Sequence, residues 1–170
     1  IVILPSQYRL LLRLAAPRIR EWDQRAAGHW DTAIAGNSAL RAQLLRALKV
    51  EVCQAQCLCT VHFLWDLRKL YDSVRVSILQ GRLYSLGYPA VLTVLGFVAH
   101  KAPRVLKAGP SLGRVLGPSG RSILAGCQQS CSWARALLHD LVQQLGYVLP
   151  KSICFQHVDD LSQVAAHKEP

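Results

Sequence analysis

The sequence predicts an α+β fold in which helices back a small antiparallel sheet. Two segments, 38–52 and 128–146, carry apolar residues at helical spacing. Two others, 57–65 and 151–158, are short apolar runs rich in β-branched and aromatic residues, as is typical of strands. With 170 residues, of which 51% are hydrophobic, the chain can bury a core and is not of the disordered class.

The N-terminal quarter is predicted to be helical. Residues 6–26 have a helical apolar rhythm, and we expect Pro17 to break or kink this helix into two pieces because proline lacks the amide donor. Residues 28–37 are typical of a loop, and Asn37 or Ser38 can cap a helix that runs to about residue 52. The residues expected to share one side of this helix are Leu40, Leu44, Leu45 and Leu48.

The middle of the chain alternates between strand and helix signals. The uninterrupted apolar run 57–65 predicts a central strand that ends on Asp66. Residues 73–87 have helical spacing, Gly87 fits a C-cap, and Pro89 can open the next helix. Residues 101–122 are rich in Gly and Pro and contain five basic residues and no acidic one, which predicts an exposed loop or irregular hairpin.

The C-terminal part predicts a helix, a strand, a turn and a further short strand. Residues 128–146 form the clearest helix, with Gly146 as its stop. In the strand 151–158, Ile153 and Phe155 share one face, while Cys154 and Val158 share the other. The inner face of the helix is expected to carry Trp133, Leu137, Leu138, Leu141 and Leu145.

Charge and targeting signals narrow the classes of partner. A net charge of +10 favours polyanions, with nucleic acid as the first choice and an anionic membrane as the second. No convincing signal peptide is present, so we expect an intracellular protein of the nucleus or cytoplasm, not a secreted one. The apolar stretch 88–100 is too short to span a bilayer, which favours a buried helix and no membrane partner.

The six cysteines do not form a usual zinc pattern. The spacings around Cys53, Cys57, Cys59, Cys127 and Cys131 differ from those of zinc ligands, although His62 lies close to Cys59. Without a secretory signal, we expect buried free thiols.

Two adjacent carboxylates, Asp159 and Asp160, follow the strand 151–158 with no basic residue nearby. Like charges repel, most strongly near a low-dielectric core. One interpretation is a hairpin turn, in which Asp is common. The other is a divalent cation, because Mg²⁺ prefers carboxylate oxygens. If this strand neighbours the strand that ends on Asp66, the three carboxylates converge and can hold two Mg²⁺ ions about 4 Å apart for an in-line phosphoryl transfer; alternatively, Asp66 caps a helix.

At these positions the chain resembles the reverse transcriptase family, most closely the non-LTR retrotransposon and group II intron types. "FLWDLRKLYDSV" (63–74) is similar to the first palm motif, and "HVDDL" (157–161) is similar to the Asp-Asp signature. "SILAGCQQSCSWARALL" (122–138) resembles the motif between them, and "ILPSQYRLLLRL" (3–14) resembles the first fingers motif. The motifs occur in the family's order.

The resemblance implies a fold and an activity. The implied fold is a polymerase palm in a split βαβ style at 57–170, preceded by a mostly helical fingers portion at 1–56, with the thumb absent. The implied function is that of an RNA-directed DNA polymerase fragment, which transfers dNTPs to a primer 3′ end by two-metal-ion chemistry. The implied cofactor is Mg²⁺, two ions, with Mn²⁺ as the alternative. The implied partners are an RNA template, a DNA primer and dNTPs.

The resemblance also assigns roles to individual residues. Asp66 and Asp159 would be the principal metal ligands, with Asp160 beside them in a lesser role. The backbone of Leu67 would face the second metal, and Tyr71 would be the steric gate against a ribose 2′-hydroxyl.

Two further residues would lie near the nucleotide. Gln129 would lie near the nascent base pair, and Gly126 would allow close backbone approach. The plainer alternatives are a core aromatic at Tyr71 and a solvent-facing Gln129 in the first turn of its helix.

The chain departs from the family pattern in several places. His157 stands where the family prefers Tyr or Phe, and "GCQQS" lacks the second Gly and the Pro of that motif. "WDTAIAGNSAL" (30–40) replaces the fingers signature. The alternative function is therefore a catalytically inactive retroelement-derived remnant that only binds nucleic acid. A small helical membrane-associated protein is a third hypothesis.

Overall fold

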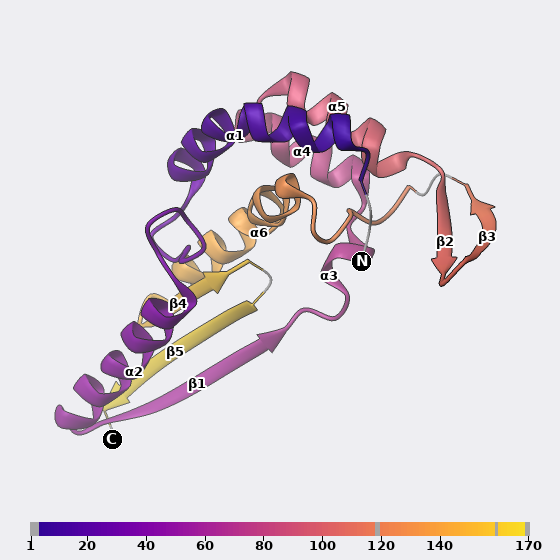
Figure 1. Ribbon diagram of the computed structural model, residues 1–170. Helices are drawn as coiled ribbons and strands as arrows, with labels where there is room; N and C mark the ends of the chain where they lie inside the picture. The colour runs from indigo at the N-terminus through magenta and orange to yellow at the C-terminus, as the bar shows by residue number, and fades with distance from the viewer. Residues whose placement is uncertain (1–3, 118–119, 159, 169–170) are drawn as a thin grey trace. The chain divides into compact units, whose positions relative to one another are not determined.

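The structure is a computed structural model that describes residues 4–117, 120–158 and 160–168. Over these residues it has six helices and two small antiparallel sheets (Figure 1), which confirms the predicted α+β class. The chain forms two compact units: unit 1 comprises Ile1–Ile19 and Lys69–Trp133, and unit 2 comprises Arg20–Arg68 and Ala134–Pro170. The division into a fingers-like portion (1–56) and a palm-like portion (57–170) concerns function and stays a prediction.

Unit 2 contains a three-stranded antiparallel sheet. Its strands are β1 (Leu58–Asp66), β4 (Ser152–His157) and β5 (Asp160–Lys168), in the order β1-β5-β4. The predicted central position of β1 is wrong, because β1 forms an edge and β5 lies in the middle with Leu161 and Val164 buried. An apolar run indicates that a segment forms a strand. Its position in the sheet depends on pairing with strands that are distant in the sequence, which the run itself does not show.

Two helices cover opposite faces of this sheet. Helix α2 (Ala39–Ala55) contacts all three strands, and Ala42 and Phe155 line a cavity on its side. Helix α6 (Gln128–Val148) lies on the other side, where Val142 and Cys154 line a second cavity. Because Cys154 and Phe155 are neighbours in β4, their side chains point to opposite faces.

Helix α2 begins as predicted but presents an unexpected face to the sheet. The hydroxyl of its N-cap Ser38 accepts a hydrogen bond from the Arg41 amide at 3.1 Å. Only the small residues Ala42 and Cys53 are buried. The leucines predicted to share one side of the helix are exposed, namely Leu40, Leu44, Leu45 and Leu48.

The longest helix of the N-terminal part, α1 (Ser6–Ala26), is continuous through Pro17. Of the two expected effects, a break or a kink, the break is wrong. Proline removes one helical hydrogen bond, but Leu12, Ile19 and Trp22 are buried along the same helix, and this packing favours its continuation.

The rest of unit 1 consists of α3 (Leu70–Ser73), α4 (Val76–Ser85), α5 (Ala90–Lys101) and a hairpin. Gly87, with φ +66°, follows α4, and Pro89 is the N-cap of α5, as predicted. Strands β2 (Arg104–Ala108) and β3 (Ser111–Leu116) pair with a register shift and are largely exposed. The predicted irregular, exposed hairpin at 101–122 is thereby confirmed.

Helix α6 is longer than predicted and buries different residues. It passes Gly146, the predicted stop, and ends at Val148. Trp133 and Leu138 are buried as predicted, but Leu141 is exposed and Arg135 is buried.

None of the six cysteines, all of which lie in the described residues, forms a disulfide, and only half of them are buried as expected. Cys53, Cys127 and Cys154 are buried, in agreement with the expectation. The expectation is wrong for Cys57, Cys59 and Cys131, which are exposed.

Candidate catalytic carboxylates

The pairing of β1 with β5 brings two of the predicted carboxylates together. In the antiparallel register Asp66 lies directly opposite Asp160, so their side chains share one face of the sheet. Directly opposed residues have Cα atoms about 4.5–5.5 Å apart. The third carboxylate, Asp159, lies outside the described residues.

This arrangement differs in detail from the expected one. The strands β1 and β4 were expected to be neighbours, but β5 lies between them. Because β5 is antiparallel to β1, its first residue meets the last residue of β1, and that first residue is Asp160.

Asp66 and Asp160 are both exposed, and no described residue forms an ion pair with either of them. Like charges directly opposite each other destabilise a sheet. A divalent cation between the two carboxylates would remove this repulsion, and carboxylate oxygens are the ligands that Mg²⁺ prefers. Over the described part of the chain, no group of three or more His, Cys, Asp or Glu side chains is arranged to hold a metal ion.

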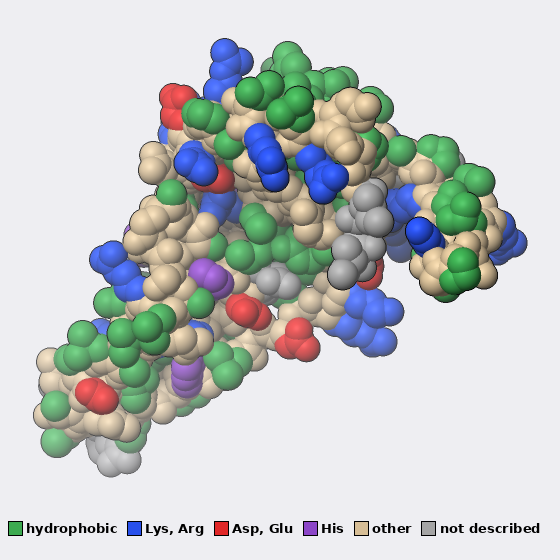
Figure 2. Space-filling model, viewed as in Figure 1, with side chains coloured by type: hydrophobic (Ala, Val, Ile, Leu, Met, Phe, Trp, Pro, Cys, Tyr) green, Lys and Arg blue, Asp and Glu red, His purple; other side chains and the backbone are tan. Residues whose placement is uncertain are grey.

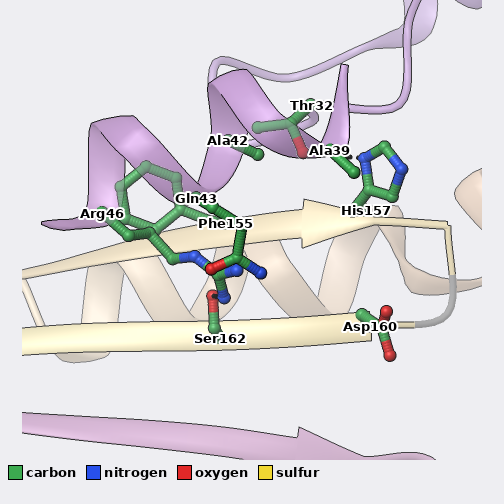
Figure 3. Close-up of a pocket in the computed structure, with 9 residues that line it drawn as sticks. All are labelled: Thr32, Ala39, Ala42, Gln43, Arg46, Phe155, His157, Asp160 and Ser162. Atoms are coloured by element: carbon green, nitrogen blue, oxygen red, sulfur yellow. Dashed lines mark hydrogen bonds between the residues drawn. The ribbon is translucent and has the colours of Figure 1, made fainter. Parts of the chain in front are cut away.

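A small cavity of about 60 Å³ adjoins Asp160 (Figure 3). Its lining comes from α2, the loop before it, and strands β4 and β5. Arg46 extends from α2 to Ser162 of β5 and donates a hydrogen bond to the Ser162 hydroxyl at 2.7 Å. A positive charge therefore lies on the same face of the sheet as Asp160, two residues further along β5.

The end of β4 is tightly held. Thr32 Oγ1 donates to the Gln156 carbonyl at 2.8 Å and lies 3.2 Å from Nδ1 of His157. A hydroxyl has a single proton, so the His157 Nδ1 is the donor in the second contact. Val158 follows with φ +60°, which is strained for a β-branched residue but suits the first position of a two-residue hairpin connection.

The predicted nucleotide-contacting residues divide between the units. Leu67 follows β1 in unit 2 and is half-buried. Tyr71 and Gly126 belong to unit 1, where the Tyr71 carbonyl accepts a hydrogen bond from the Ile123 amide at 2.8 Å. Gly126 has φ +87°, a conformation that favours glycine, and a Cβ at this position would meet no atom of the described residues within 4 Å.

Gln129 is fully buried, and the solvent-facing alternative is therefore wrong. Its Nε2 donates to the Tyr8 hydroxyl at 3.4 Å, and its Oε1 has no hydrogen-bond partner among the described residues. Its predicted place near a nascent base pair stays a prediction.

Sequence reasoning missed a buried charged cluster centred on Arg135. This guanidinium pairs with the carboxylates of Asp31 and Asp23, and its Nη2 donates to the Ala33 carbonyl at 3.0 Å. Burial alone would lower the pKa of Arg135, but hydrogen bonds and attraction to Asp31 and Asp23 outweigh it and raise that pKa. The available signal was that Arg135 is the one Lys or Arg within 128–148 and lies among alanines of the helix interior.

The chain was compared with protein-family models and with curated proteins, and neither comparison found a match. None of the helices in the described ranges has both the length and the apolar character required to cross a bilayer. The fold and site together therefore define an α+β protein with an exposed, opposed carboxylate pair.

Proposed function

We propose that this chain is the fingers and palm portion of a reverse transcriptase, which adds dNTPs to a DNA primer 3′ end on an RNA template. The observation that carries the proposal is the cross-strand pairing of Asp66 with Asp160 at the exposed end of the sheet. In the motif order given by the sequence, these residues come from the first palm motif and the Asp-Asp signature. Their placement on adjacent strands brings two carboxylates close enough to share a divalent cation, the ligand type that two-metal chemistry uses.

Three features support this assignment. Strand β5, which begins at Asp160, lies between β1 and β4. Asp66 of the first palm motif and Asp160 of the Asp-Asp signature therefore lie at the same end of the sheet. The face opposite the carboxylates is covered by the C-terminal part of α6, whose first half (128–138) belongs to the intermediate motif. The other face carries Asp66, Asp160 and the positively charged Arg46.

In this proposal Asp66, Asp159 and Asp160 hold Mg²⁺, which supplies charge stabilisation to the transferring phosphoryl group. By the resemblance to the family, Tyr71 would exclude a ribose 2′-hydroxyl and the Leu67 backbone would face the second metal. Lys and Arg side chains contact nucleic acid phosphates, which the net charge of +10 favours. Figure 2 shows these basic side chains dispersed over the visible face rather than gathered in one patch.

The test is primer extension on an RNA template with the purified chain, Mg²⁺ or Mn²⁺, and dNTPs. Asp66→Asn and Asp160→Asn should lower incorporation by about 100- to 1,000-fold, because each replaces an anionic carboxylate that would hold the metal ion. Asp72→Asn, which neutralises an exposed carboxylate in α3, is the matched control and should extend the primer normally. Equal activity in all three variants would refute the catalytic assignment.

The exposed hairpin β2–β3 favours the second candidate function, nucleic-acid binding without polymerisation. Residues 101–122 carry five basic side chains and no acidic one. A chain that binds an RNA–DNA duplex in a salt-dependent way but incorporates no dNTP with either metal would support this function over the polymerase.

A further inference from the structure

We propose that Arg135 is a positioning residue: through the loop 30–33 it holds the end of β4 and thereby keeps Asp160 opposite Asp66. The inference rests on the proposed function, because it assigns a role in that same carboxylate site. Arg135, the loop and the three strands all belong to unit 2.

The first step is the attachment of Arg135 to the loop. Its side chain is 4% exposed, and its guanidinium pairs with Asp31 and donates to the carbonyl of Ala33. Asp31 is also buried, and its Oδ1 accepts a hydrogen bond from the Ala33 amide at 2.8 Å. The planar guanidinium thus fixes both a side chain and the backbone of the loop.

The second step is the attachment of the loop to β4. Asp31 forms a parallel bridge with Gln156, in which the Gln156 amide donates to the Trp30 carbonyl at 2.8 Å. The Thr32 amide donates back to the Gln156 carbonyl, also at 2.8 Å. The loop therefore acts as a short additional strand beside β4.

The third step leads from β4 to the carboxylates. His157 is the Cα partner of Asp160, and Asp160 is the Cα partner of Asp66. Gln156 Nε2 also donates to the carbonyl of Val158 at 3.1 Å, in the strained connection between β4 and β5. Strained backbone persists only where its surroundings hold it, so loosening the loop should release this connection.

Positioning matters because metal ligands tolerate little displacement. Loss of a group that orients a metal ligand typically lowers metal affinity or activity by about 10- to 100-fold. A residue that merely stabilised the fold would lower the fraction of folded protein and leave the folded molecules with normal metal affinity.

The experiment compares Thr32→Val and Arg135→Lys with Thr93→Val in the full chain. Thr32→Val keeps the side-chain shape but removes the hydroxyl hydrogen bonds to Gln156 and His157. Arg135→Lys keeps the positive charge but loses the planar guanidinium that bonds several acceptors at once. Thr93→Val removes a hydroxyl bond within α5 of unit 1 and is the matched control. The readouts are Mn²⁺ affinity by electron paramagnetic resonance, kcat and KM in primer extension, and amide hydrogen exchange.

We expect both unit 2 variants to weaken Mn²⁺ binding and to lower kcat by about 10-fold, with the KM for primer–template unchanged. Amide exchange of residues 156–162 should accelerate in both variants, and Thr93→Val should match the parent in every readout. Faster exchange with unchanged Mn²⁺ affinity and kcat would overturn the positioning role. A parent chain whose Mn²⁺ binding is insensitive to Asp66→Asn would instead refute the proposed function, and the inference with it.

Discussion

Each unit contains a buried polar cluster, and the two clusters differ in how completely their polar groups are paired. In unit 2 the charged Arg135 has Asp31, Asp23 and the Ala33 carbonyl as partners. In unit 1 a neutral cluster surrounds Gln129, with Tyr8, His100 and Trp133 nearby in the interior. Oε1 of Gln129, Nε2 of His100 and Nε1 of Trp133 have no partner among the described residues.

The difference follows from the cost of burial. An unpaired neutral polar group costs about 1–3 kcal/mol in a protein interior. An unpaired charge costs several times more, so a buried guanidinium must be surrounded by acceptors. The comparison predicts that removing one partner from the charged cluster lowers the unfolding free energy strongly, whereas removing one partner from the neutral cluster changes it little.

The largest effect is expected for Arg135→Met. The substitution keeps much of the side-chain volume but leaves the buried Asp31 carboxylate without its cation, which should cost about 3–5 kcal/mol of unfolding free energy. Urea unfolding followed by circular dichroism measures this loss. Adding Asp31→Asn to the same chain should recover part of it, because the stranded charge is removed; a loss below about 1 kcal/mol for Arg135→Met alone would contradict the prediction.

A smaller effect is expected from protonation of His100. Its Nδ1 accepts a hydrogen bond from the Leu124 amide at 2.9 Å, so the neutral ring carries its proton on Nε2. Burial, with a smaller contribution from Arg104, lowers the pKa of His100 to about 4. Because the folded pKa lies below the unfolded one, the stabilisation is complete above pH 6.5 and is lost as pH falls toward 4, by roughly 3 kcal/mol.

The measurement for His100 is the unfolding midpoint between pH 7 and pH 4.5. His100→Asn keeps an acceptor for the Leu124 amide but does not titrate in this range, so its curve shows the contribution of all other groups. Parallel curves for the parent and His100→Asn would show that His100 contributes nothing to the pH dependence.

The smallest effect is expected for Gln129→Met. The parent side chain makes one long hydrogen bond and leaves Oε1 unpartnered among the described residues, so an apolar replacement of similar length should change stability by less than about 1 kcal/mol. Thermal unfolding of the variant beside Arg135→Met tests the comparison directly. A loss of stability similar to that of Arg135→Met would show that the neutral cluster contributes as much to stability as the charged one.

Local features were predictable from the sequence because their causes are local. Ser38 caps α2 through a bond to a residue three positions away, and Gly87 and Pro89 act on their own backbone. The tertiary choices were not predictable in this way. Periodicity showed that α2 has a leucine-rich side, but it did not show that the buried residues of this helix would be Ala42 and Cys53.

The candidate site was likewise predictable in its local features but not in its tertiary pairing. Convergence of carboxylates at one sheet end follows from where the apolar runs stop, and the structure brings Asp66 and Asp160 together. The identity of the opposed residue depends on strand register, which no local pattern encodes here. The pairing of Arg135 with Asp31 joins residues 104 positions apart, and composition gives no information at that distance.

The outer edge of β1 has a practical consequence for handling the protein. Among the described strands β1 pairs only with β5, and its residues Leu58–Asp66 include no Pro, Lys or Arg, the usual protections of a sheet edge. Several of its apolar side chains also face solvent. Concentrated samples should therefore tend to aggregate by strand addition, and a lysine placed at Phe63 offers a way to keep them dispersed.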